Sequence, residues 1–152
     1  MLKRIALTAA VLTCCSAGWS KIGETDAQIK ARYGESIGDI PTASFGPVRG
    51  FAVPGYVVGV KLVNGGSAME MISKNDQSQM TDQEIETLLK QHGADVPWKP
   101  DRFDKADWKR WRSDDGKLVG VYDTMRHFLY VNSKQFYDDQ GKRTGKEEQQ
   151  SR

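Results

Sequence analysis

Two short segments of the chain carry the same helical pattern of hydrophobic and polar positions. In the first segment, Ile29 and Tyr33 stand four residues apart, with Lys30, Ala31 and Arg32 between them. The second segment has apolar positions at the spacing i, i+3, i+4 and i+7. These positions are Ile85, Leu88, Leu89 and His92. A stripe with this spacing predicts an amphipathic helix that covers a core with one side.

The residues around both stripes agree with this prediction. Thr25-Asp26-Ala27-Gln28 precedes the first stripe and Thr81-Asp82-Gln83-Glu84 precedes the second. A Thr followed three residues later by Gln or Glu is a capping box, in which each side chain binds the other residue's backbone N–H. Gly34 and Gly93 follow the stripes, as expected for glycines that end helices. We therefore predict two short, well-capped helices.

Each predicted helix is followed by sequence typical of β-strands. Tyr56–Val63 and Ala68–Ile72 flank Asn64-Gly65, and Asn-Gly between β-forming runs is a strong hairpin signal. Three further runs follow the second helix and read as strands: Trp108–Arg112, Leu118–Tyr122 and Phe128–Val131. The stretch Gly34–Gly55 is rich in Gly and Pro and reads as a connector.

The order of helix and strands therefore occurs twice, which predicts an α+β fold with two short helices packed on an antiparallel sheet. Val57-Val58-Gly59-Val60 resembles Leu118-Val119-Gly120-Val121 at the corresponding place. One interpretation is a domain of residues 21–137 made of two related helix-plus-hairpin units, about 21–75 and 76–137, with an extra strand in the second. The other is that well-capped helices of any small α+β domain look alike.

Residues 1–20 have the organisation of a secretory signal peptide. Lys3 and Arg4 precede the apolar run Ile5–Leu12, and small residues follow at 16–18. The run is much shorter than the roughly 20 residues that span a bilayer. We expect an exported protein, periplasmic or extracellular, cleaved near Ala17 or Gly18, with no transmembrane segment in the mature chain.

Both cysteines lie in the signal peptide, so we expect a mature domain without thiols or disulfides. Cys15 is a candidate for lipidation, because Leu12 stands three residues before it, as in bacterial lipoprotein signals. Cys14 occupies the position where those signals place a small residue. Two interpretations stay open: a lipid anchor at Cys15, or simple cleavage.

Composition and charge exclude some classes of partner. The chain has 22 basic and 20 acidic residues, and loss of Lys3 and Arg4 leaves 20 of each. A neutral domain gives no reason to expect a nucleic acid or an anionic surface as partner. The last segment, Asp138–Arg152, has no apolar residue and predicts a disordered polar tail.

The sequence shows no pattern that indicates catalysis or metal binding. His92 and His127 are the only histidines, and the GxSxG and HExxH motifs are absent. His92 lies on the apolar helix stripe, where a packed side chain is the usual interpretation, and His127 lies in a predicted turn. We expect no enzyme activity, no catalytic residue, no cofactor and no metal.

The most unusual segment is Trp98–Arg112, which holds three of the four tryptophans. Within a strand, Trp108 and Trp111 would point to opposite faces of the sheet. One of the two should then be buried and the other at least partly exposed. An exposed Trp beside Arg is typical of a binding surface, and the alternative is packing of all the rings under Lys and Arg stems. The candidate surface consists of Trp98, Arg102, Trp108, Arg110, Trp111 and Arg112.

The helix starts, with the terminal glycines and the signal peptide, resemble the SmpA/OmlA (BamE-like) small bacterial envelope domains and the repeats of β-lactamase inhibitor proteins. The matching pieces are Thr25–Ile29 with Gly34 and Thr81–Ile85 with Gly93. The resemblance implies a binding or scaffolding role without catalysis. We therefore predict a non-catalytic envelope or secreted binding domain, whose partner is an envelope or extracellular protein. The alternatives are an inhibitor of an extracellular hydrolase, and a small module that binds polysaccharide through Trp98, Trp108 and Trp111.

Overall fold

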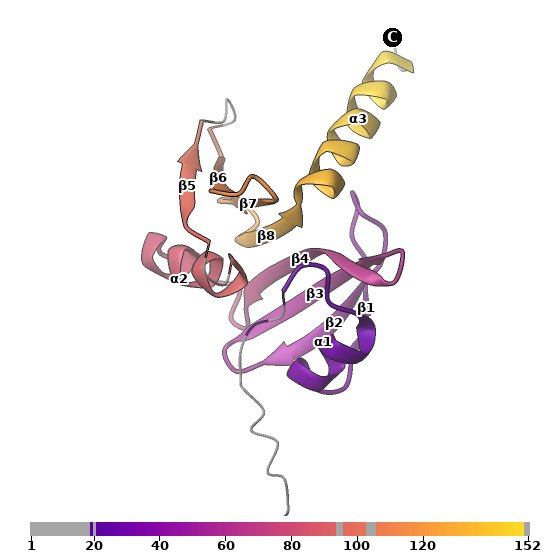
Figure 1. Cartoon of the computed structure of the whole chain (residues 1–152), viewed down its shortest axis with the longest axis vertical. Coiled ribbons are helices and arrows are strands. Elements are labelled where there is room, and N and C mark those ends of the chain that lie inside the picture. Colours follow the sequence, from indigo (N-terminus) through magenta and orange to yellow (C-terminus); the bar gives the residue numbers. More distant parts are fainter. Residues whose placement is uncertain (1–18, 20, 94–95, 103–105, 151–152) are drawn as a thin grey trace, which may run out of the picture.

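A computed structural model describes residues 19, 21–93, 96–102 and 106–150, and for 144–150 it describes the backbone alone. The described chain forms three helices and eight strands (Figure 1). In chain order they are α1 (Asp26–Tyr33), β1 (Gly38–Ile40), β2 (Val48–Val53), β3 (Tyr56–Val63), β4 (Gly66–Lys74), α2 (Asp82–Gly93), β5 (Trp98–Asp101), β6 (Trp108–Ser113), β7 (Leu118–Asp123), β8 (Phe128–Ser133) and α3 (Lys134–Gln150).

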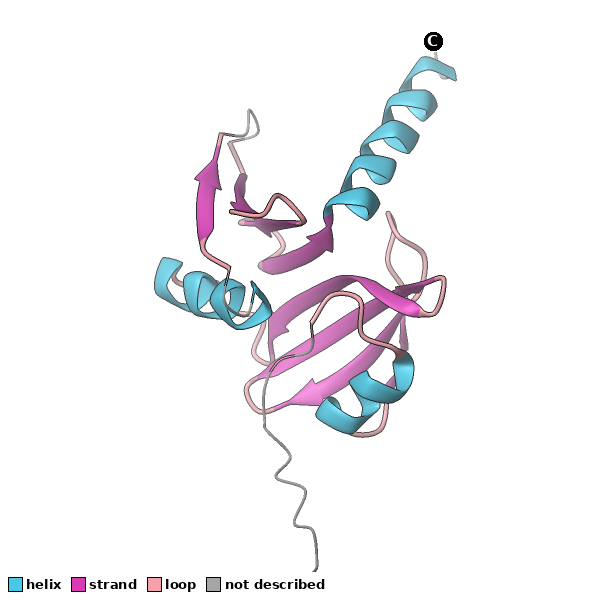
Figure 2. Cartoon of the chain, in the orientation of Figure 1, coloured by secondary structure: helices cyan, strands magenta, loops and turns pink. Residues whose placement is uncertain are grey.

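The eight strands form one antiparallel sheet in the order β1-β2-β3-β4-β8-β7-β6-β5. Each of the helices α1 and α2 is followed by four strands that pair in succession, and the two sets join where β4 pairs with β8. The α+β class and the antiparallel sheet are confirmed. The structure has a third helix, α3, where two were predicted, and the chain is mostly sheet, since strand residues outnumber helical ones (Figure 2).

The Asn64-Gly65 turn closes the β3–β4 hairpin as the sequence predicts. Asn64 and Gly65 both have positive φ, 52° and 84°, and Val63 pairs with Gly66 directly across the turn. Two central residues with positive φ make the turn whose twist matches that of the flanking strands, and this explains the preference for Asn-Gly.

Both capping boxes are present. The backbone N–H of Thr25 donates to Gln28 Oε1 at 2.9 Å, and that of Gln28 donates to Thr25 Oγ1 at 3.4 Å. At the start of α2, Thr81 donates to Glu84 Oε2 at 2.7 Å, and Glu84 N–H donates to Thr81 Oγ1 at 3.2 Å. Both helix starts are therefore fixed by local sequence.

Helices α1 and α2 lay their apolar stripes on the same face of the sheet. Ile29 of α1 and Ile85 of α2 are buried in one cluster with strand residues from both halves of the sheet. Those strand residues are Phe51, Val58, Val60, Ile72, Trp111, Tyr122, Leu129 and Val131. The main core therefore lies between this face and the two helices.

The opposite face has a smaller apolar cluster. Val48, Met69 and Met71 are buried there, packed by partly buried residues that include Phe45 and Phe136. Phe136 belongs to the first turn of α3, so this helix covers part of the second face where it leaves β8 (Figure 1).

The end of the chain departs from the prediction of a disordered tail over Asp138–Arg152. The structure instead extends α3 as far as Gln150. Ser133 Oγ accepts from the N–H of Phe136, and Lys134 pairs with Asp138 one turn on at 2.5 Å. These local contacts start a helix that continues beyond its last apolar residues. Within the described part of the chain, no helix combines the length and apolar character needed to cross a membrane.

Three strands lie outside the predicted set. Strands β1 and β2 fall in the stretch that was interpreted as a connector, and β5 begins the tryptophan-rich segment. Short strands flanked by Gly and Pro carry too little periodicity to be recognised from one sequence.

Candidate functional site

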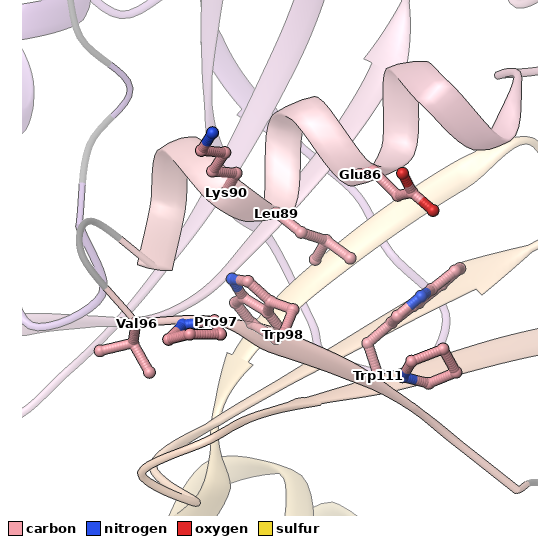
Figure 3. A pocket seen from close by; sticks show the side chains of 8 residues that line it. Glu86, Leu89, Lys90, Val96, Pro97, Trp98 and Trp111 are labelled. Atoms are coloured by element: carbon pink, nitrogen blue, oxygen red, sulfur yellow. The ribbon is translucent and has the colours of Figure 1, made fainter.

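A groove of about 590 Å³ lies between α2 and the edge of the sheet (Figure 3). Its volume is in the range of small-molecule or side-chain pockets. The lining residues are mainly apolar or aromatic: Leu89, Val96, Pro97, Trp98, Pro100 and Trp111, with Glu86 and Lys90 at the rim. Two of the three tryptophans of the predicted segment therefore share this site.

Strand pairing places both rings on the groove side of the sheet. Pro100 of β5 pairs with Trp111 of β6, and Trp98 pairs with Ser113. Trp98 and Pro100 are two residues apart, so they point to the same face, and Trp111 points to that face as the partner of Pro100. Trp111 is 9% exposed and Trp98 is half-buried.

Two glycines let α2 approach closely enough to form the groove. A Cβ at Gly120 would lie 2.5 Å from Leu89 Cδ2, and one at Gly93 would lie 2.4 Å from Trp98 Nε1. Gly34 ends α1 with φ 86°, as predicted, whereas Gly93 is the last residue of α2 and its φ is not positive. The role of Gly93 is thus to leave room for the indole ring of Trp98.

The rim of the groove carries two charges from α2. Glu86 and Lys90 are exposed, one turn apart, and Figure 3 shows Glu86 toward the Trp111 end and Lys90 toward the Trp98 end. The neighbouring acids of the helix are paired, Asp82 with Lys109 and Glu84 with Lys74. Among the residues that the structure describes, none pairs with Glu86.

The predicted six-residue surface is divided between the two faces of the sheet. Trp98 and Trp111 line the groove, whereas Trp108, Arg110 and Arg112 point to the opposite face, because they alternate with Trp111 along β6. The predicted contrast between Trp108 and Trp111 is confirmed, since Trp108 is half-buried and Trp111 is buried. The six residues therefore do not form one continuous surface.

The arginines of the opposite face are held by partners within the chain. Asp101 Oδ2 lies 2.9 Å from Arg110 Nε and also pairs with Arg112. The hydrogen bond from Arg112 and the charge of Arg110 outweigh desolvation and hold the pKa of Asp101 below its ordinary value. Arg110 also donates to Tyr137 of α3 and to the carbonyl of Arg102. The charges of Arg110 and Arg112 are therefore engaged within the chain.

A second polar cluster, buried under the helices, was not predicted. Glu70 of β4 and His92 of α2 have fully buried side chains, and His92 Nε2 lies 3.0 Å from Glu70 Oε2. Tyr33 donates to the same oxygen at 3.0 Å. Glu70 Oε1 is buried and has no hydrogen-bond partner among the described residues. In the sequence, the one sign of this cluster is Glu70, an acid within the otherwise apolar run Ala68–Ile72.

The geometry places a proton on one ring nitrogen of His92. Its Nδ1 lies 2.9 Å from the carbonyl oxygen of Leu88, which can only accept, so Nδ1 carries a proton. Its Nε2 faces the Glu70 carboxylate. Burial alone would lower the pKa of His92, but the hydrogen bond to Glu70 and the charge of that carboxylate raise it above its ordinary value. The raised pKa favours the charged form of His92 in this pair, which is enclosed in the core.

Trp19 covers this buried pair from the N-terminal side. Its ring centroid lies 5.6 Å from that of His92, 5.4 Å from Tyr56 and 6.2 Å from Tyr33. Trp19 belongs to residues 1–20, which the sequence predicts as a signal peptide, whereas in the structure its ring packs into the domain. Cys14 and Cys15, with the lipidation hypothesis, lie outside the described residues.

His127 lies apart from this cluster, in the β7–β8 turn, where its Nδ1 is 2.8 Å from the carbonyl oxygen of Gln77.

Comparison with models of protein families, with curated proteins and with solved structures finds no match for this chain. The resemblance to BamE-like domains therefore stays a prediction, and function must be argued from the site itself.

Proposed function

We propose that the protein is a non-catalytic binding module, exported to the bacterial cell envelope or beyond, that holds a segment of a partner protein in the groove between α2 and β5. The observation that supports this most is the groove itself, where two tryptophans and two prolines meet beside a helix. Aromatic rings in a desolvated pocket, with a charged rim, are what protein interfaces use as anchors.

The chemistry of the described residues fits binding better than turnover. The one close histidine–acid pair, His92 with Glu70, is closed to solvent and lies in the core rather than in the groove. Among the described residues that line the groove, only Glu86 and Lys90 are ionisable, and both lie on its rim. An arrangement with a nucleophile beside an oriented base would be needed for hydrolysis.

Capture from the native envelope fraction tests this proposal. Pro97→Arg places a bulky charged side chain at an exposed position of the groove wall, and we expect it to abolish capture of the partner. Ala52→Arg adds the same charge at an exposed position of β2 and should capture normally. Equal capture by the two variants would contradict the proposal.

A polysaccharide ligand is the second candidate, favoured by the tryptophans that line the groove. Sugars stack on the open faces of aromatic rings, and Trp111 is only 9% exposed. We therefore rank a partner protein first. An extracellular hydrolase is one such partner, and this domain would then act as its inhibitor.

A further inference from the structure

We infer that the partner segment enters the groove with a lysine or arginine side chain, whose charge pairs with Glu86 and whose aliphatic stem lies on the apolar floor. This inference rests on the proposed function of the groove. It concerns the chemistry of the ligand rather than the location of the site.

The floor of the groove suits an aliphatic stem. Leu89, Trp98, Pro100 and Trp111 give it an apolar surface with no ionisable group. The one polar atom of the Trp98 side chain, Nε1, is buried against Gly93 and has no hydrogen-bond partner among the described residues. A ligand group on the floor therefore gains by hydrophobic contact rather than by hydrogen bonding.

The rim determines the charge and the orientation of the ligand. Glu86 is an exposed carboxylate without a partner in the described part of the chain, at the end of the groove where Trp111 lies (Figure 3). A cation there is attracted by the carboxylate. Lys90 at the other end repels a cation, so the charged tip is directed toward Glu86.

The edge of the sheet favours recognition through side chains. Strand β5 is the last strand of the sheet, and Pro100 within it has no N–H to offer an added strand. Lys99 beside it is exposed and charged, which also discourages strand pairing. A partner segment would therefore insert a side chain rather than extend the sheet.

The test uses a blocked pentapeptide of alanines with a central lysine, titrated into the domain while the indole N–H resonances of Trp98 and Trp111 are followed by NMR. We expect both resonances to shift at millimolar peptide. The same peptide with Nε-acetyl-lysine should bind about five- to tenfold more weakly, because it lacks the charge.

Glu86→Gln should weaken binding of the lysine peptide by the same factor. Glu35→Gln removes the same charge from an exposed position after α1 and should leave binding unchanged. Equal binding of the charged and acetylated peptides, no effect of Glu86→Gln, or no shift with either peptide would overturn the inference. So would a neutral oligosaccharide that moves the same resonances independently of Glu86. If Pro97→Arg still abolishes partner capture in any of these cases, the proposed function survives and only the ligand chemistry is wrong.

Discussion

The buried charges of Glu70 and His92 are the least expected side chains of the core. Neither partner is accessible to solvent, and each is costly to bury alone. Tyr33 and the Leu88 carbonyl complete part of the hydrogen bonding and fix the position of the two groups. The pair joins the central strand β4 to α2, and so it specifies where this helix lies on the sheet.

The first prediction at this scale concerns pH. The folded-state pKa of His92 is raised above the ordinary value of 6.5, so the pair's contribution to stability is complete below that pH. The contribution is lost as the pH rises through the folded pKa, because the folded protein then gives up a proton that it binds more tightly than the unfolded chain. Urea unfolding measured from neutral to alkaline pH should show the stability falling across that window.

Two variants show whether His92 causes this slope. His92→Gln should flatten it and cost about 3 kcal/mol, since Glu70 is then left as an unpaired buried charge. His127→Gln removes the other histidine and should keep the slope. A slope that persists in His92→Gln would show that another group is responsible.

The second prediction concerns Gly93. An alanine Cβ there would lie 2.4 Å from Trp98 Nε1, so Gly93→Ala should displace the ring and destabilise the fold by about 1–3 kcal/mol. Gly141→Ala in α3 meets nothing within 4 Å and should be neutral or slightly stabilising. Thermal melts and tryptophan emission spectra of the two variants check this. Equal stability of the two would contradict the packing role of Gly93.

At the scale of elements, the sequence predicts what local chemistry determines. The capping boxes at Thr25 and Thr81 and the Asn64-Gly65 hairpin are read correctly, because each depends on residues only a few positions apart. Strands β1, β2 and β5 are missed, because three to six residues near Gly and Pro form strands only when a neighbouring strand supplies the partner.

The candidate site, too, could be predicted only in part. Trp98 and Trp111 were recognisable from the composition of their segment, but their groove also needs Leu89 and Glu86 of α2, the helix that precedes β5. Alternation along the strand already separates Trp108 from Trp111, and the structure places Arg110 and Arg112 on the face of Trp108. How α2 packs against β5 and β6 depends on tertiary contacts that one sequence does not give, so the groove could not be predicted.

The N-terminal segment carries the third prediction. Trp19 packs against Tyr33, Tyr56 and His92, so we expect cleavage of the exported protein to leave Trp19 in the mature chain, consistent with a site near Ala17 or Gly18. Intact-mass analysis of the exported protein locates the cleavage and detects any acyl group on Cys15. A mature chain that begins after Trp19 would contradict this prediction. Trp19→Ala should lower the free energy of unfolding by about 2 kcal/mol, and unchanged stability of this variant would also contradict it.

At the scale of the whole molecule, a helix followed by four strands occurs twice along the chain, and the two sets of strands join where β4 pairs with β8. Such an order is what two related units would produce, and we propose that origin for the fold. The main core takes residues from both halves, such as Ile29 and Phe51 from the first and Ile85 and Leu129 from the second. Neither half could bury its helix stripe alone.

This shared core predicts a single cooperative unfolding transition. The calorimetric enthalpy should equal the van't Hoff enthalpy, and fluorescence and circular dichroism should give coincident curves. Two separate transitions, or a stable fragment of residues 21–75, would show that the halves are independent domains instead.

The central claim is that the groove between α2 and β5 holds the partner, and amide hydrogen exchange of the domain with its captured partner tests it most directly. We expect binding to slow exchange in residues 86–93 and 96–101 and to leave β2 and the first turns of α3 unchanged. Protection confined to α3 and the face that carries Arg112, with residues 86–101 unaffected, would contradict the claim.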